Sequence, residues 1–157
     1  MTKSDLFKVA LLGVPFDDNS SFERGPALAP SVIRDVLSHG SLNGSTELGI
    51  NLRESDRWLD AGDINVTVPE NFIVAIEQRC DQLLSNNTRL VTLGGDHSIS
   101  YPVLKSYRKH FDQLTILHID AHSDLYDSFK GNRYSNACPF ARVMEDGLCD
   151  RLVQVGI

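Results

Sequence analysis

Apolar residues recur along the chain in two patterns, one typical of buried strands and one of amphipathic helices. Near-continuous apolar runs predict strands at residues 6–16, 58–64, 88–95, 113–120 and 152–157. Helical spacing of apolar residues predicts helices at residues 29–40, 70–85 and 100–111. Strands and helices therefore alternate, and strands this apolar are typical of parallel sheets covered on both faces. We expect an α/β fold with a mainly parallel sheet.

The predicted helices have apolar faces and recognisable ends. The first is expected to start at Pro30 or Ser31 and to stop at Gly40. Four residues share its apolar face: Val32, Ile33, Val36 and Leu37. Six residues form the face that the second helix is expected to bury: Phe72, Ile73, Ile76, Cys80, Leu83 and Leu84. Residues 41–57 are polar and irregular, so we expect no regular element there.

Composition narrows the classes of partner. With 157 residues, 41% of them hydrophobic, the chain is long enough for one domain. A formal charge of −6 without a basic cluster disfavours nucleic acid. No apolar run approaches the roughly 20 residues of a membrane span, so we expect no membrane partner and a cytoplasmic location. Cys80, Cys138 and Cys149 are odd in number and widely spaced, which predicts reduced thiols rather than a disulfide framework or a zinc knuckle.

Charged residues follow directly on the apolar strand at 113–120, in the motif DAHSD at residues 120–124. If the chain stays extended, Asp120, His122 and Asp124 project to one side. Carboxylates this close repel each other unless a cation lies between them. Two carboxylates and an imidazole suit manganese, iron or zinc better than calcium. A solvated loop is the alternative, but it does not explain charge next to a buried strand.

A second motif, GGDHS at residues 94–98, follows the preceding strand. Its glycines allow a tight turn, and Asp96 or Ser98 could cap the next helix while His97 points to the rim of the sheet. An ordinary turn with an incidental histidine is an equally good interpretation of this motif alone. Because the carboxyl ends of parallel strands share one rim, we expect His97 near the acidic cluster.

Other titratable residues receive weaker assignments. His118 lies on the Asp120 side of its strand but deeper, which favours a supporting or core role. His39 and His110 lie at predicted helix ends, and we assign them no catalytic or metal-binding role. Asp60 and Asp63 could line the same rim, although a turn at Gly62 explains them equally well.

Taken together, the motifs resemble those of the ureohydrolases, the family of arginase, agmatinase and formimidoylglutamase. The similarity rests on GGDHS, on DAHSD followed by Asp127, on GPALAPSVIR at 25–34 and on DAGD at 60–63, and it covers essentially the whole chain. It implies a three-layer α/β/α, arginase-like fold and a binuclear manganese centre. By resemblance, His97 and Asp124 bind one Mn²⁺ ion, His122 binds the other, and Asp120 bridges both. A hydroxide between the ions would attack a guanidinium or formimidoyl carbon, usually releasing urea.

The chain departs from the family pattern in its extent. The family completes both metal sites with a second carboxylate pair, whereas this chain contains no D-x-D sequence. We therefore interpret residues 1–157 as the N-terminal part of a single, truncated domain whose C-terminal half is absent. The family sheet also places two later strands between those that end in the two motifs. Without them, we expect His97 and Asp120 to lose their normal separation and strand edges to be exposed.

A further departure is Asn136 in YSNACPF, where relatives commonly have a histidine that is thought to shuttle protons. Asn136 cannot take that role, so no catalytic residue is assigned. Asp127 or Arg133 could contact a substrate, although surface roles are favoured.

The leading hypothesis is a manganese-dependent, agmatinase-like hydrolase of small guanidino substrates, inactive or impaired as this isolated chain. For a complete member we expect a homo-oligomer. The alternative is a non-catalytic metal-binding or interaction protein that pairs with a full-length relative. A relative of the deacetylases that share this general fold is a weaker reading, because GGDHS fits ureohydrolases better.

Overall fold

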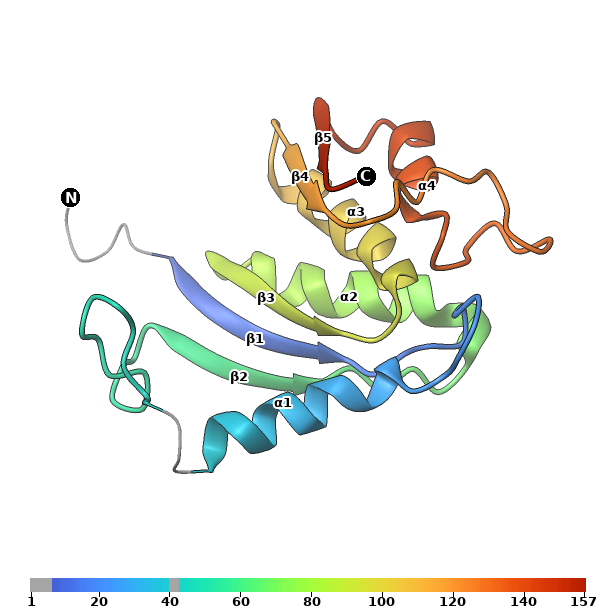
Figure 1. The fold of residues 1–157 in the computed structure, drawn as a ribbon. Helices are drawn as coiled ribbons and strands as arrows, with labels where there is room; N and C mark the ends of the chain where they lie inside the picture. Colours follow the sequence, from blue (N-terminus) through green and yellow to red (C-terminus); the bar gives the residue numbers. More distant parts are fainter. Residues whose placement is uncertain (1–6, 40–42) are drawn as a thin grey trace.

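The strands form two separate parallel sheets (Figure 1) in the computed structural model, which describes residues 7–39 and 43–157. The larger sheet has the order β2-β1-β3, with β1 at Lys8–Val14, β2 at Trp58–Asp63 and β3 at Thr88–Gly94. The smaller sheet pairs β4, Thr115–Ile119, with β5, Arg151–Val155. Three predicted features extend outside the described residues: the start of the first strand at Leu6, the helix stop at Gly40, and residues 41–42 of the irregular segment.

Parallel pairing brings the carboxyl ends of neighbouring strands to one rim. In the larger sheet Lys8 of β1 pairs with Thr88 of β3, and the register continues to Val14 and Gly94. In the smaller sheet Thr115 pairs with Arg151. Both GGDHS and DAHSD therefore begin where a strand ends, as the sequence predicts.

Four α-helices surround the sheets: α1 at Ala29–Ser38, α2 at Phe72–Leu84, α3 at Ser100–His110 and α4 at Pro139–Glu145. Helices α1 and α2 lie on opposite faces of the larger sheet (Figure 1). Helix α3 packs against α2 and α4 and runs between the larger sheet and β4. The sequence pattern predicted the first three helices but not α4, which has Pro139 at its first turn.

Two apolar clusters form the core, one under each sheet. The larger joins β1 to α2 and contains Leu12, Val14, Phe16, Ile64, Phe72, Ile76, Cys80 and Ile99. The smaller joins β4 to α3 and α4 and contains Tyr101, Ile116, Phe140, Val143 and Leu148. The clusters are linked by Ile73 of α2, which packs against both. Packing between α2 and α3 therefore holds the two sheets together.

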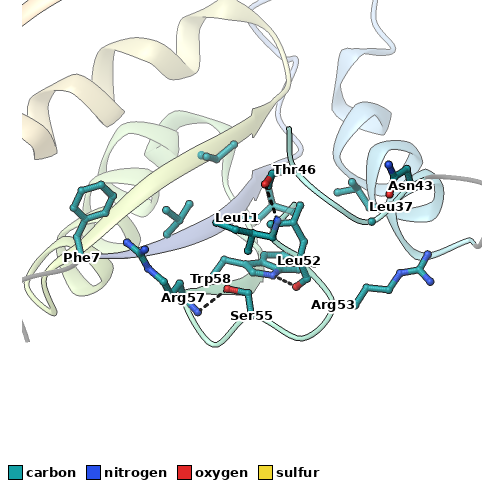
Figure 2. Close-up of a pocket in the computed structure, with 14 residues that line it drawn as sticks. Phe7, Leu11, Leu37, Asn43, Thr46, Leu52, Arg53, Ser55, Arg57 and Trp58 are labelled. Carbon is teal, nitrogen blue, oxygen red and sulfur yellow. Dashed lines mark hydrogen bonds between the residues drawn. The ribbon is translucent and has the colours of Figure 1, made fainter. Parts of the chain in front are cut away.

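The apolar faces of the helices differ in how far they are covered. On α2, Phe72, Ile76, Cys80 and Leu84 are buried, as predicted, while Ile73 and Leu83 are partly buried. On α1 the four apolar residues stay exposed, with Val32 at 57% and Val36 at 53%. An open pocket beside this helix is lined by apolar side chains of β1, β2 and the 43–57 loop, including Leu11, Leu52 and Trp58 (Figure 2). Within the described residues, this face of the sheet lacks a complete covering layer.

The three cysteines are free thiols. Burial raises the pKa of Cys80 to about 12, so this thiol stays protonated and packs as part of the core. No helix among residues 7–39 and 43–157 is both long and apolar enough to cross a membrane.

Candidate metal site

The turn after β3 is fixed by contacts that only certain residues allow. A side chain at Gly95 would collide with the carbonyl oxygens of Val14 and Phe16, so this position requires glycine. Asp96 is 5% exposed and caps the following turn, since its Oδ1 accepts a hydrogen bond of 2.9 Å from the Ser98 amide. Its Oδ2 accepts a hydrogen bond of 3.0 Å from the Asn19 amide. Asp96 therefore fixes the backbone on which His97 is presented.

Burial raises the pKa of the Asp96 carboxyl, and the hydrogen bonds from Ser98 and Asn19 oppose that effect. Through its bond to Asn19, the buried carboxylate of Asp96 holds the 17–21 loop against the rim of the larger sheet. Asp96 acts as a structural acceptor at the rim, one position before the histidine.

In the second motif, DAHSD, the chain is no longer extended, because it turns directly after β4. Strand β4 ends at Ile119, and the Asp120 amide still donates to the carbonyl of Val155 at 3.1 Å. Oδ1 of Asp120 accepts a hydrogen bond of 3.0 Å from the His122 amide, which turns the chain. Asp124 has a φ of 51°, and its carbonyl accepts a bond of 3.1 Å from the Phe140 amide at the start of α4. This turn brings the Asp124 side chain inward, and it is only 10% exposed.

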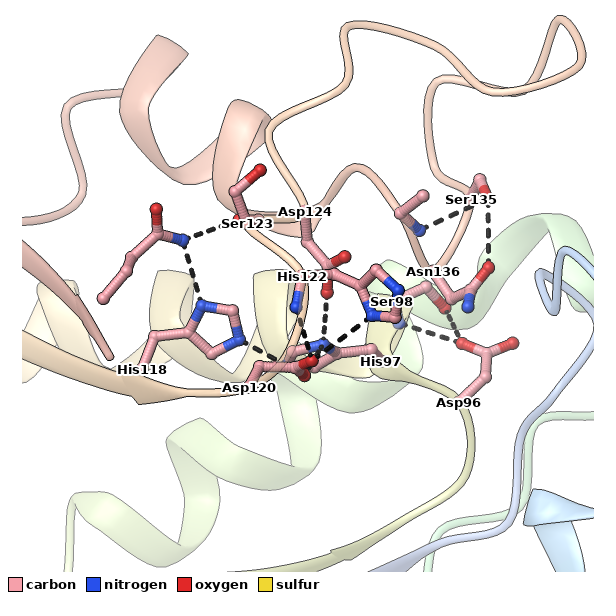
Figure 3. A network of polar contacts seen from close by, with 12 residues as sticks. Asp96, His97, Ser98, His118, Asp120, His122, Ser123, Asp124, Ser135 and Asn136 are labelled. Atoms are coloured by element: carbon pink, nitrogen blue, oxygen red, sulfur yellow. Dashed lines mark hydrogen bonds and ion pairs between the residues drawn. The ribbon is translucent and has the colours of Figure 1, made fainter. Parts of the chain in front are cut away.

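The two motifs converge although their strands belong to different sheets (Figure 3). Nδ1 of His97 lies 2.6 Å from Oδ2 of Asp124 and 3.7 Å from Oδ2 of Asp120. Nε2 of His118 lies 3.5 Å from the same Asp120 oxygen. One ligand atom from each of these four residues lies within 4.8 Å of all the others. The side chains of His97 and Asp120 therefore lie close together, although no strand pairing joins their two sheets.

His122, the fourth ligand that the sequence suggested, lies apart from this group. Its side chain is 81% exposed, and its Nδ1 lies 3.5 Å from Oδ1 of Asp120. The alternation that placed His122 beside the two carboxylates assumed an extended chain, whereas the strand ends at Ile119. His118, on the strand itself, is buried within the group instead.

The donor set fits a divalent transition metal. A hydrogen bond from the His122 amide, with the neighbouring His97 and His118, lowers the pKa of Asp120. Its carboxylate is therefore ionised at neutral pH and can accept a cation. Two carboxylate oxygens with imidazole nitrogens are the mixture that manganese, iron and zinc accept. On this part of the chain, the ligands available to a second ion would be His122 and Oδ1 of Asp120, the carboxylate oxygen nearer to His122.

Residues 7–157 match the model of the Arginase family. The chain belongs to the arginase family. Arginase 1, mitochondrial, from Arabidopsis thaliana is 44% identical over 158 residues, which cover 94% of this chain and 46% of that protein. The structure of an arginase from Medicago truncatula matches with a TM-score of 0.87 at 39% identity, covering 95% of this chain and 50% of that one. A hypothetical agmatinase from Burkholderia thailandensis matches with a TM-score of 0.84 at 29% identity, covering 96% and 50%.

The comparisons confirm the ureohydrolase resemblance and the arginase-like α/β fold that the motifs implied. This arginase-family chain spans about half the length of the relatives that it matches. The two sheets and their helices therefore match about half of the chain in the Medicago truncatula arginase structure.

Asn136, at the position that the resemblance assigns to a proton shuttle, is held by hydrogen bonds in this arginase-family chain. Its Oδ1 accepts from the Ser21 amide at 2.9 Å and from the Ser135 hydroxyl at 3.2 Å. The backbone N–H of Asn136 donates to the carbonyl of Asn19 at 3.1 Å. The side chain therefore ties the 130–138 loop to the 17–21 loop.

Asp127 and Arg133 pair with each other at 2.7 Å, and Asp127 also accepts from Arg142 at 2.9 Å. Arg142 is 5% exposed, and its Nη1 donates to the carbonyl of Asp127 at 2.8 Å. Sequence reasoning missed this residue, because an arginine on an unpredicted helix carries no motif. The network anchors the long loop between β4 and α4.

Asp60 and Asp63 turn toward α1 rather than toward the ligand group. Arg34 of α1 pairs with Asp60 at 2.8 Å and also with Asp63, and it donates to the carbonyl of Gly62 at 3.0 Å. These contacts join two motifs of the family resemblance, GPALAPSVIR and DAGD. Their observed role is to attach α1 to the end of β2.

Proposed function

We propose that this chain supplies the first half of a manganese-dependent hydrolase site that cleaves linear guanidino C–N bonds and releases urea. The observation that carries the proposal is the convergence of His97, Asp120 and Asp124 from two sheets, with ligand atoms within 4.8 Å. When bound, divalent ions lower the pKa of a coordinated water and stabilise charge that develops on an attacked carbon. We assign the complete site two Mn²⁺ ions.

Each side chain has a distinct proposed role. His97 and Asp124 would hold one ion, His122 would hold the second, and Asp120 would supply an oxygen to each. The buried Asp96 keeps His97 at the rim, because it fixes the turn on either side of it. At the second position the His122 side chain is exposed, with its Nδ1 3.5 Å from Oδ1 of Asp120.

Arginine is the substrate that we propose to test first. The sequence favoured an agmatinase-like activity, but several relatives at 43–45% identity are named arginases. Other matched proteins are named for agmatine or for guanidino acids, so the shared substrate chemistry is a guanidino group. Comparing arginine with agmatine separates the two finer assignments.

Calorimetry with Mn²⁺ on the purified chain tests the site. We expect saturable binding that Asp124→Asn abolishes, while Asp35→Asn, a change of an exposed carboxylate on α1, leaves it unchanged. Absence of Mn²⁺ binding would refute the proposal. A urea assay with arginine and agmatine on the same samples should show no turnover or very weak turnover. Urea release at an ordinary enzymatic rate would contradict the expected impairment.

A non-catalytic metal-binding or interaction protein is the second candidate. Asn136 favours it, because a carboxamide does not act as a general acid or base near neutral pH, and this side chain already helps to hold two loops together. Manganese binding without turnover, even after a complementary C-terminal half of a relative is added, would select this candidate. Urea release by such a mixture would select the hydrolase.

The cytoplasmic location and the expected homo-oligomer also remain proposals. Reduced thiols agree with a reducing compartment. The Arabidopsis relative, however, is named mitochondrial. Fractionation of cells that express the chain, followed by immunodetection, tests the location, and sedimentation analysis tests the oligomeric state.

A further inference from the structure

His118 lies inside the ligand group and is 6% exposed, yet the family resemblance gives it no role. It faces inward from β4, where buried and exposed residues alternate. Its ring packs against Phe140 with 4.1 Å between the ring centroids, and against His97 at 5.2 Å. A buried imidazole beside two carboxylates can act either as a metal ligand or as a group that orients a ligand.

Gln154 on β5 distinguishes these two roles. It pairs with His118 in the register of the smaller sheet. Its Nε2 lies 2.6 Å from the carbonyl oxygen of Ser123 and 3.0 Å from Nδ1 of His118. A carbonyl oxygen can only accept, so the amide nitrogen must be the atom that faces it. The second hydrogen of the same amide group then points to His118.

That hydrogen bond assigns the tautomer of the imidazole. Nδ1 of His118 must accept, so it carries a lone pair and the ring proton resides on Nε2. The Nε2–H group lies 3.5 Å from Oδ2 of Asp120 and has no closer hydrogen-bond partner among the described residues. Metal ligation through Nε2 would need the lone pair there and a hydrogen on Nδ1, directed against the amide hydrogens of Gln154.

We propose that Gln154, itself oriented by the carbonyl of Ser123, locks His118 as the Nε2–H tautomer, so that His118 directs Asp120 toward the metal and is not a ligand. His118 is thus a positioning residue. Oδ1 of Asp120 accepts a hydrogen bond of 3.0 Å from the His122 amide, and Nε2 of the imidazole lies 3.5 Å from Oδ2. The metal part of this inference rests on the proposed function, whereas the tautomer does not.

The tautomer can be read directly from ¹⁵N NMR of the imidazole nitrogens in the full chain without metal. His118→Gln assigns the signals by their loss. We expect a protonated Nε2 and an unprotonated Nδ1 in the wild type. Gln154→Glu replaces the donor by a group that can only accept, so the proton should move to Nδ1. Gln78→Glu, an exposed change on α2, should leave the tautomer unchanged. An Nδ1–H tautomer in the wild type, or no change in Gln154→Glu, would overturn the proposal.

Titration of the labelled chain with Zn²⁺, which is diamagnetic, tests the role toward a metal. We expect the ring signals of His97 to shift while the Nε2–H signal of His118 persists. Loss of that proton on binding would identify His118 as a ligand and overturn the positioning role. If no ion binds, the proposed function fails, whereas the metal-free spectra still decide whether the lock exists.

Calorimetry with Mn²⁺ separates positioning from simple packing. His118→Phe keeps an aromatic ring but loses the donor, and changes of groups that orient a ligand typically weaken metal binding about 10–100-fold. His118→Gln can restore a donor toward Asp120, so we expect it to recover most of the affinity. Equal losses in both variants would contradict a role as hydrogen-bond donor. Thermal unfolding of each variant reports whether the fold is intact.

Discussion

Replacing Asp96 by alanine should destabilise the fold, because this carboxylate joins the end of β3 to the 17–21 loop. The change removes the acceptor for the amides of Ser98 at 2.9 Å and Asn19 at 3.0 Å. Loss of the cap costs about 1 kcal/mol, and loss of a hydrogen bond to a charged group costs about 1.5–3 kcal/mol. Burial already disfavours the charged carboxylate, which offsets part of this cost. We therefore expect a loss of about 2–3 kcal/mol in the free energy of unfolding.

Urea denaturation followed by circular dichroism measures this loss. For a small protein the slope is about 1–3 kcal/mol per molar urea, so the midpoint should fall by about 1 M with the slope unchanged. Asp18→Ala is the matched control, since among residues 7–39 and 43–157 the Asp18 side chain pairs only with the exposed Arg24, and its loss should cost less than about 1 kcal/mol. A loss below about 0.5 kcal/mol in Asp96→Ala would refute the argument that this carboxylate fixes the turn before His97.

Three further changes test other parts of the structure. Ile76→Ala should cost about 2–5 kcal/mol in denaturant unfolding, because Ile76 is fully buried under the larger sheet, whereas the exposed Val74→Ala should cost little. Burial raises the pKa of Asp81, but hydrogen bonds from Lys109 and Ser106 outweigh it and lower the pKa overall. The wild type should therefore lose stability as the pH falls below the ordinary value of 3.8, and Asp81→Asn should flatten this part of a pH series of unfolding curves. Asn136→His should lower stability by about 1 kcal/mol, because the Ser21 amide loses its acceptor, without giving the isolated chain urea release; Asn136→Asp, which keeps an acceptor, should retain more stability.

The local pattern of apolar residues predicted most of the strands and helices, but not how they are arranged in space. Continuous apolar runs identified the strands because both faces of a parallel strand need apolar contacts. Helix α4 was missed, since seven residues are too few for a periodic signal. The separation of β3 from β4 also has no local signal, because it depends on which segments lie between them in space.

The same limit applies to the candidate metal site. The positions of the two motifs suggested that His97 would lie near Asp120 and Asp124, and the structure brings them together, but from two sheets and not at one rim. Their role as metal ligands stays a prediction. The spacing did not show that the chain turns after Ile119, which exposes His122 and leaves His118 in the group. A hydrogen bond from a backbone amide to Asp120 controls that turn, and such a bond depends on geometry that a period of two cannot encode.

Helices α2 and α3 provide the packing between the two sheets, and this has a consequence for the energetics of ligand capture. His97 follows a strand of one sheet, and Asp120 and Asp124 follow a strand of the other, so an ion held by all three would cross-link the two sheets. The affinity for the ion would then depend on how firmly α2 packs against α3, because any free energy needed to hold the sheets in place would come from binding. Substitutions in this junction, far from any ligand atom, should change the dissociation rate of the ion before they change its coordination.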